Sequence, residues 1–171
     1  AAIDPDRGLD HGAWVPLLLM YPEADIPVAQ VAVQTHLGPA HHYRLGQALA
    51  ALRDEGVLVL GSGAYTHNLM ELRGLRQQGI TQEPDWVTSF ADWTDRALLE
   101  GRVDDLLAYR RLAPNGARNH PTEEHLLPLF VAMGAGGVTG ARHLHASTTH
   151  AALRMDVYGF GAEALAERQA A

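Results

Sequence analysis

The chain has 171 residues, which suits one domain with a substantial core, and 47% of them are apolar without a run long enough to span a membrane. Its 13 Lys and Arg stand against 20 Asp and Glu, and the formal charge of -7 argues against a surface that neutralises nucleic-acid phosphates. Cysteine is absent, so disulfides and thiolate metal sites are excluded, and any metal must be held by imidazole, carboxylate or water. No secretory signal is visible in residues 1–10, and we expect a cytoplasmic protein without nucleic-acid or membrane partners.

The N-terminal region joins two unlike segments. Residues 1–12 have no apolar periodicity, yet they run directly into residues 13–22 (AWVPLLLMYP), an apolar stretch that needs burial. A domain rarely begins so abruptly.

The segments that follow predict a strand, a helix and a second strand. Residues 27–34 alternate as a strand does, and residues 40–55 carry leucines at spacings typical of an amphipathic helix that ends at Gly56. Residues 57–60 form a short apolar run typical of a buried strand. Two strands joined by a helix through short connections indicate a parallel crossover. We therefore expect an α/β fold with a mostly parallel central sheet flanked by helices.

The second half of the chain is predicted to be mostly helical. Helices are expected over residues 68–78, 85–100 and 103–112, and the aromatic side chains of the second are expected in the core. After a loop at residues 113–121, Thr122 is predicted to cap a helix that runs to about Met133. A strand over residues 151–160 and a helix over residues 163–168 complete the prediction. Without repeats or a linker, residues 1–171 are treated as a single domain.

Three of the ten histidines lie at the boundaries of predicted elements, where scaffolds present chemistry: His11, His67 and His125. His67 follows Gly61-Ser62-Gly63 at the end of a predicted strand, and the carboxyl ends of parallel strands form the ligand crevice of such sheets. The glycines would let the backbone turn and approach a substrate closely. From the motif alone, a capping role for His67 stays equally open.

A functional role is not expected for six other histidines. His36, His41 and His42 lie at a predicted loop and helix start, and His143, His145 and His150 are expected to be surface, packing or substrate-contact residues. The spacing of the last three resembles a loose metal-binding tract, but they lack a recognised ligand motif. The chain also has no zincin, nucleophile-elbow or Walker motif.

Four segments match the pattern of a known family in the same order along nearly the whole chain. They are residues 7–28 (RGLDHGAWVPL, then MYP and ADIPV), 61–69 (GSGAYTHNL), 121–129 (PTEEHLLPL) and 155–160 (MDVYGF). Together they resemble the class III extradiol ring-cleavage dioxygenases, specifically the DOPA 4,5-dioxygenase branch.

The resemblance implies a mononuclear non-haem metal enzyme that opens the ring of a catechol such as DOPA with dioxygen. Fe(II) is the expected metal for activity, and Zn(II) can occupy the site in isolated protein. His125 would be a metal ligand, and His67 either a ligand or the acid/base histidine that faces the substrate. His11 would hydrogen-bond the substrate hydroxyl or oxygen. Glu123 and Glu124 are interpreted as helix-end charges rather than partners of the metal ligands.

One departure from the family pattern is informative. Members carry a domain-sized segment ahead of the first motif, and its histidines complete the metal site. We therefore expect this chain to be an N-terminally incomplete, C-terminal part of the fold, which binds metal weakly and turns over poorly alone. The segment would be lost from the gene product, missing from this sequence, or supplied by a partner chain.

Two alternatives remain from the sequence. One is a zinc-dependent hydrolase that uses His67 and His125 with a water, which the lack of a third ligand disfavours. The other is an inactive remnant that acts as an interaction module and forms homo-oligomers through an exposed apolar patch.

Overall fold

The computed structural model describes residues 3–161, which form two compact units, residues 3–33 and residues 34–161. The helix predicted over residues 163–168 lies outside the described residues. The single-domain assignment stays a prediction. No described helix is long and apolar enough to cross a membrane.

The N-terminal unit contains one helix, α1 (His11–Met20), none of whose side chains is buried. Asp10 caps it by accepting from the Ala13 N–H, which satisfies one of the free donors at the helix start. The same carboxylate accepts from Gln30 Nε2 at 2.7 Å, and Gln30 Oε1 accepts from the Asp10 N–H at 3.0 Å. This reciprocal pair ties the helix start to the segment that follows it.

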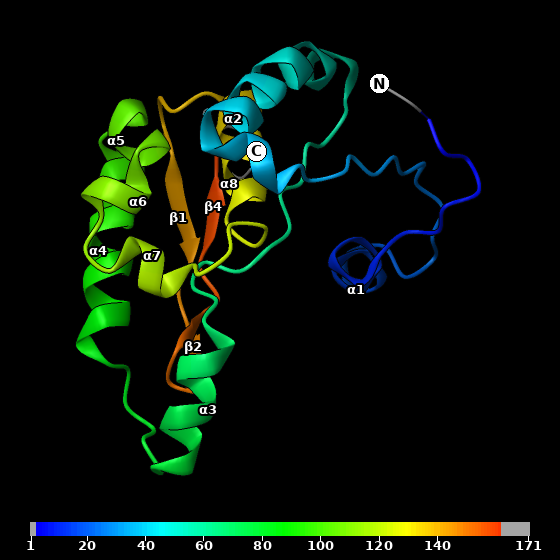
Figure 1. Ribbon diagram of the computed structural model, residues 1–171. Helices are drawn as coiled ribbons and strands as arrows, with labels where there is room; N and C mark the ends of the chain where they lie inside the picture. Colours follow the sequence, from blue (N-terminus) through cyan, green and yellow to red (C-terminus); the bar gives the residue numbers. More distant parts are fainter. Residues whose placement is uncertain (1–2, 162–171) are drawn as a thin grey trace, which may run out of the picture. The chain divides into compact units, whose positions relative to one another are not determined.

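The second unit begins with the helical segments η1 (Thr35–Leu37), α2 (Gly38–Leu49) and η2 (Ala50–Glu55). The helix predicted up to Gly56 is thus confirmed, although its last turns are 3-10, and Gly56 adopts the left-handed conformation that a glycine cap allows. Helix α2 packs against α8 (Leu127–Gly136), as Figure 1 shows. The backbones of the two helices touch at Gly134, where a Cβ would lie 2.1 Å from the Tyr43 carbonyl oxygen.

The middle of the chain forms the helices α3 (Leu69–Gln77), α4 (Asp85–Leu99), α5 (Val103–Leu107), α6 (Tyr109–Leu112) and α7 (Gly116–Asn119). The main core lies between α8 and the helices α4, α5 and α6, and a second cluster joins α3 and the start of α4 to Ala151 and Ala152. Of the aromatics predicted in the core, Trp86 and Phe90 are buried and Trp93 is half-buried. Tyr109, Phe130 and Met133 are buried as well. The helix predicted over residues 103–112 is divided at Ala108, and the predicted loop at 113–121 contains α7.

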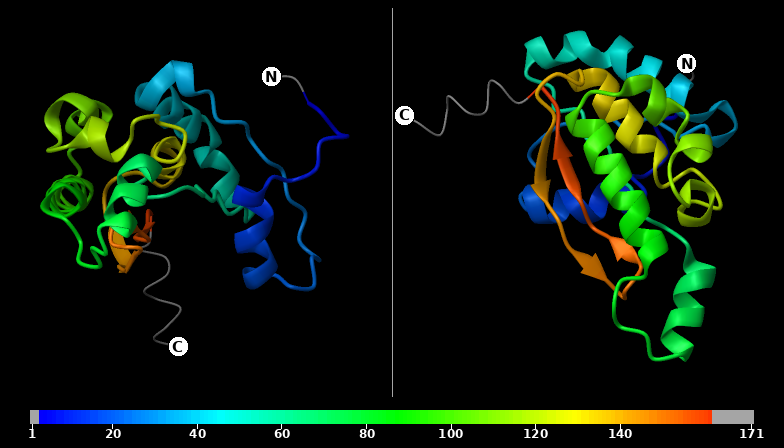
Figure 2. Two further views of the ribbon diagram at one scale, coloured as in Figure 1. Left: turned by 60° about the horizontal axis from the view of Figure 1, so that its bottom comes forward. Right: turned by 90° about the vertical axis from the view of Figure 1, so that its left-hand side faces the viewer.

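Four short strands form two antiparallel pairs in the described residues. β1 (Arg142–His145) pairs with β4 (Val157–Gly159), and β2 (Thr148–Thr149) pairs with β3 (Leu153–Arg154). Helix α4 runs beside the β1–β4 pair, as the right-hand view of Figure 2 shows. The strand predicted over residues 151–160 is therefore two strands, interrupted at Met155 and Asp156.

The expected parallel central sheet is not confirmed, because both pairs in the described residues are antiparallel. The strands predicted over residues 27–34 and 57–60 are wrong for this structure, since neither segment belongs to a ladder. An apolar pattern indicates a segment that suits a sheet, but a strand exists only when a neighbour bonds its backbone. Val57, Leu58 and Leu60 are accordingly exposed rather than buried.

The helix predicted to begin at Thr122 begins at Leu127. Thr122 does not cap it, since its hydroxyl donates to Glu124 Oε1. Pro128 explains the difference: proline fits the first turn of a helix, but inside one it lacks the N–H that the ladder needs. Glu123 and Glu124 therefore precede the helix and are not charges within its first turn.

Candidate functional site

His67 and His125 lie face to face in the second unit. Their ring centroids are 3.5 Å apart and the ring planes differ by 27°. His67 comes from the loop before α3, and His125 from the turns before α8. The structure therefore brings together two of the three histidines that the sequence singled out.

Backbone hydrogen bonds hold the two loops against each other. The Ala64 N–H donates to the His125 carbonyl at 3.0 Å, and the His67 N–H donates to the Asn119 carbonyl, also at 3.0 Å. One bond ends on the His125 carbonyl and the other begins at the His67 N–H, so main-chain bonds hold the backbone from which each ring projects.

The glycines before His67 allow this close approach. A Cβ on Gly63 would lie 2.0 Å from the His125 carbonyl oxygen, and one on Gly61 would lie 2.3 Å from the Pro128 carbonyl oxygen. Neither glycine has a positive φ, so neither is required by a left-handed turn. The sequence predicted that these glycines allow the backbone to approach a substrate closely. In the structure the close neighbour is instead the loop that carries His125.

Asn68 connects the pair to α3. Its Oδ1 accepts from the Glu71 N–H at 3.1 Å and caps the helix, while its Nδ2 donates to the Arg118 carbonyl at 2.6 Å. One side chain therefore fixes where α3 begins and anchors the end of the His67 loop to the segment before His120.

The surroundings of His67 favour its neutral form. Burial, and secondarily the nearby His125, lower the pKa of His67 from its ordinary value of 6.5, against an opposing effect of Glu124. Glu124 Oε1 lies 3.8 Å from His125 Nε2. A neutral imidazole presents a nitrogen lone pair, which is what a metal or a transferable proton requires.

Sequence reasoning missed His120, which is completely buried beside this site. Its Nε2 lies 2.9 Å from the Tyr65 carbonyl oxygen. Burial, as the largest cause, lowers its pKa to about 4, and His67 and His125 act in the same direction. The one available signal was position: His120 directly precedes the 121–129 motif that carries His125.

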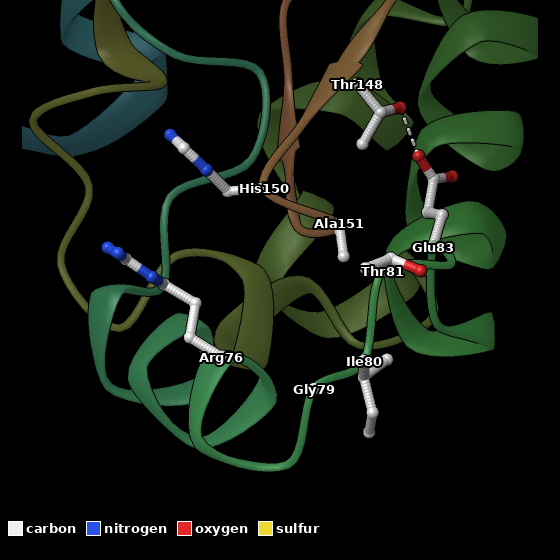
Figure 3. A pocket seen from close by; sticks show the side chains of 8 residues that line it. All are labelled: Arg76, Gly79, Ile80, Thr81, Glu83, Thr148, His150 and Ala151. Carbon is white, nitrogen blue, oxygen red and sulfur yellow. Dashed lines mark hydrogen bonds between the residues drawn. The ribbon is translucent and has the colours of Figure 1, made fainter.

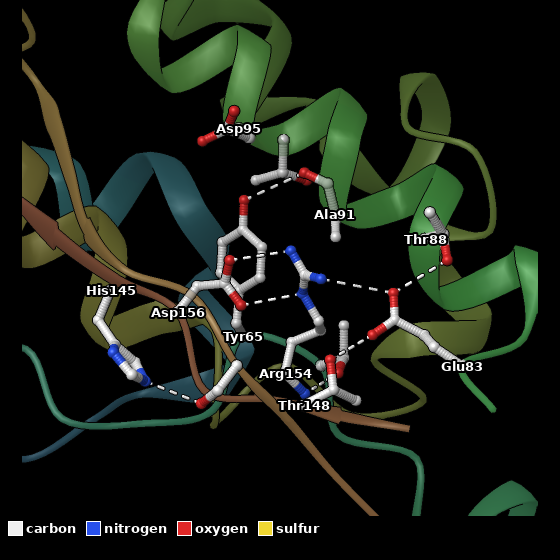
Figure 4. Close-up of polar contacts among 12 residues, drawn as sticks. Tyr65, Glu83, Thr88, Ala91, Asp95, His145, Thr148, Arg154 and Asp156 are labelled. Atoms are coloured by element: carbon white, nitrogen blue, oxygen red, sulfur yellow. Dashed lines mark hydrogen bonds and ion pairs between the residues drawn. The ribbon is translucent and has the colours of Figure 1, made fainter. Parts of the chain in front are cut away.

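A polar network behind the loop holds Tyr65. The Tyr65 hydroxyl donates to the Ala91 carbonyl (Figure 4) and lies 3.2 Å from the Tyr158 hydroxyl, which donates to Asp95. Burial raises the pKa of Tyr65, so the hydroxyl stays a donor. Arg154 makes a two-pronged ion pair with the fully buried carboxylate of Asp156, at 2.9 and 3.1 Å (Figure 4).

His143 belongs to this network and not to a metal tract. Its Nδ1 lies 3.0 Å from Asp95 and its Nε2 2.9 Å from Asp156, while its ring stacks on Tyr158 with centroids 4.5 Å apart. An imidazole wedged between two carboxylates and a tyrosine ring packs the β1–β4 hairpin against α4. Of the three roles considered for His143, these contacts match packing.

The imidazoles of His67 and His125 are of a kind that binds Fe(II) or Zn(II), but two of them are fewer donors than a protein metal site usually has. Residues 3–161 contain no group of three or more His, Asp or Glu side chains that could hold a metal ion. His11 is the first residue of α1 in the N-terminal unit, and its role at the site stays a prediction.

A separate pocket of about 420 Å³ lies near the end of α3 and the β2–β3 hairpin. Arg76 and His150 lie on one side of it, and Glu83 and Thr148 on the other (Figure 3). Its lining includes neither His67 nor His125.

Comparison with known proteins defines the class of protein. The model of the family described as "Catalytic LigB subunit of aromatic ring-opening dioxygenase" matches residues 1–161. The chain belongs to this family, and the resemblance seen in its motifs is confirmed.

Individual relatives agree with this assignment. The chain is 53% identical to a 4,5-DOPA dioxygenase extradiol of Beta vulgaris over 134 residues. This match covers 78% of this chain and 48% of the relative. The corresponding protein of Escherichia coli K12 is 38% identical over 130 residues, covering 75% of this chain and 47% of that protein. The chain thus spans about half the length of the curated relatives it matches.

A solved structure has the same fold. It is that of an uncharacterized protein, JW3007, from Escherichia coli K12, with a TM-score of 0.78 and 34% identity. The match covers 89% of this chain and 62% of that one.

Proposed function

We propose that this chain carries part of the active site for extradiol cleavage of a catechol by dioxygen, with DOPA as the model substrate. The observation that carries the proposal is the stacked pair of His67 and His125, contributed by two of the four family-like motifs. Relatives named 4,5-DOPA dioxygenase extradiol support the substrate class.

In this proposal His125 is a metal ligand, and His67 is either a second ligand or the acid/base that faces the substrate. A bound divalent metal, Fe(II) for turnover or Zn(II) in isolated protein, would supply Lewis acidity and a position for dioxygen. The lowered pKa of His67 lets its imidazole take a proton from a catechol hydroxyl near neutral pH and return it later. His11 would hydrogen-bond the hydroxyl or oxygen.

The proposal also covers the parallel sheet, association with another chain and the cellular location. Residues 57–60, of which Val57, Leu58 and Leu60 are exposed, would pair as a strand of a mostly parallel sheet in the whole family fold. Those exposed side chains also favour association with another chain, including a second copy. We propose a cytoplasmic setting, in keeping with the absence of cysteine.

We further propose that the isolated chain binds metal weakly and turns over poorly, because two imidazoles hold a divalent ion less well than three protein ligands do. Metal analysis and oxygen uptake with DOPA under ferrous loading test this. Sub-stoichiometric metal and slow, DOPA-dependent uptake with a yellow ring-opened product are expected.

Two other results are informative. Stoichiometric iron with rapid uptake would contradict the weak-binding proposal while supporting the catechol chemistry. Cleavage of esters or amides by the zinc form, without any ring-opened product, would instead favour the zinc hydrolase.

A further inference from the structure

His120 is packed against two aromatic rings, and its backbone is hydrogen-bonded at both its N–H and its carbonyl. Its ring lies against Phe90, with centroids 5.6 Å apart, and edge-on to Tyr109 at 6.2 Å. Its N–H donates to the Gly116 carbonyl at 3.1 Å, and its own carbonyl accepts from Arg110 Nη1 at 2.7 Å. A fully buried side chain fixed in this way can serve as a rigid support for whatever it bonds.

The partner of the ring defines its tautomer. A carbonyl oxygen only accepts, so the Nε2 atom that faces the Tyr65 carbonyl must carry the hydrogen. Nδ1 is buried without a hydrogen-bond partner among residues 3–161, and a proton there would put an uncompensated charge in the core. His120 is therefore a neutral Nε2–H donor.

The bond from His120 reaches the loop that carries His67. Tyr65 accepts from His120, and two residues later the His67 N–H donates to the carbonyl of Asn119, the neighbour of His120. Asn119 and His120 therefore hydrogen-bond the residues on both sides of Thr66. If the ring bond were lost, the buried Tyr65 carbonyl would be unpaired, and the loop would have to shift to satisfy it.

We infer that His120 is a positioning residue, whose Nε2–H holds the Tyr65 to His67 loop so that the His67 ring stacks on His125. The geometric part of this inference stands alone; its consequence for catalysis rests on the proposed function. The inference differs from a packing role, because packing needs only the volume of the ring, whereas positioning needs a donor at the place of Nε2.

Three variants of His120 separate the two roles. His120→Gln places an amide N–H near the position of Nε2, His120→Asn is polar but too short to reach Tyr65, and His120→Leu fills space without a donor. His42→Leu is the matched control: His42 is also a buried histidine with two ring hydrogen bonds, to Gly38 and Gln34, and it lies outside both loops.

The readout is the nuclear Overhauser effect between ring protons of His67 and His125 in metal-free protein, measured beside thermal unfolding. We expect the cross-peak to survive in His120→Gln and His42→Leu and to vanish in His120→Leu and His120→Asn. An intact cross-peak in a folded His120→Leu or His120→Asn variant would overturn the inference. If His120→Leu does not fold, the Gln and Asn variants decide.

This readout needs neither metal nor substrate. The expected cross-peak pattern in a protein that never opens a catechol ring would therefore leave the positioning role intact and reject the proposed function. The reverse pattern, ring opening with no change in the cross-peak, would reject the positioning role alone.

Discussion

Gly63 lies so close to His125 that a side chain between them has no room: a Cβ would sit 2.0 Å from the His125 carbonyl oxygen. The hydrogen bond from the Ala64 N–H to the same oxygen follows directly in the chain. The glycine of the first loop and the histidine of the second are thus one structural unit, and the order of the two motifs along the sequence conceals it.

Gly63→Ala should separate the two loops. The clash is with backbone, which cannot rotate away as a side chain does, and overpacking of this kind costs about 1–3 kcal/mol of unfolding free energy. Urea unfolding and the His67–His125 cross-peak measure it. Gly74→Ala is the matched control, because a Cβ on Gly74 in α3 would meet only Gln78 Nε2, at an ordinary contact distance of 3.9 Å, and this variant should gain up to about 1 kcal/mol. Equal stability of the two variants would contradict the prediction.

Gly134→Ala should destabilise the chain without changing the histidine pair. Its Cβ would lie 2.1 Å from the Tyr43 carbonyl oxygen and push α2 and α8 apart, with a cost of about 1–3 kcal/mol or more. Circular dichroism in urea gives the stability, and the cross-peak reports the pair. A lost cross-peak in the folded variant would mean that the α2–α8 crossing positions the site after all.

The stability of the chain should fall as the pH is lowered from 6.5 towards 4. The pKa of His120 is lowered to about 4 in the folded chain, so between these values the unfolded chain binds a proton that the folded chain does not. The contribution is fully present above pH 6.5, and about 3 kcal/mol is lost across the window.

The His120→Gln variant should show a shallower pH dependence over the same window in urea unfolding. A smaller slope of the same sign should remain, because the pKa of His67 is also lowered. Identical slopes in the variant and the parent chain would show that His120 is not the group responsible.

Asn68 should prove to have two separable functions. Asn68→Ala removes both the cap of α3 and the bond to the Arg118 carbonyl, and the lost cap alone should cost about 1 kcal/mol. Asn68→Asp retains the capping acceptor but not the donor. Hydrogen exchange should therefore show faster exchange in the first turn of α3 for Asn68→Ala only. Fast exchange there in both variants would refute the capping assignment.

Local features of the fold were predictable from the sequence. The glycine cap at Gly56 and the helix over residues 85–100 with its buried Phe90 rest on short-range patterns, and the assignment of His67 and His125 to one site rests on the family-like motifs. These signals are carried by residues near one another in the chain or by motifs with a fixed order.

The features that were missed depend on distant contacts. Residues 57–60 read as a strand, but pairing needs a neighbour that periodicity does not reveal. The helix start at Thr122 was overridden by Pro128. His120 looked like a loop histidine, since nothing in its neighbours along the chain indicates Phe90 and Tyr109 against its ring or Tyr65 at its Nε2.

The central claim to test is the first of the two roles proposed for His67, in which His67 and His125 bind the metal together. Equilibrium dialysis against Zn(II) tests it with His67→Ala, His125→Ala and the double variant, and His145→Ala is the control, since His145 is exposed and bonds only Ser147 among the described residues. We expect each single variant to lose most of the zinc bound by the parent chain, the double variant to lose no more, and the control to bind as the parent does. Unchanged zinc binding in either single variant would contradict the claim.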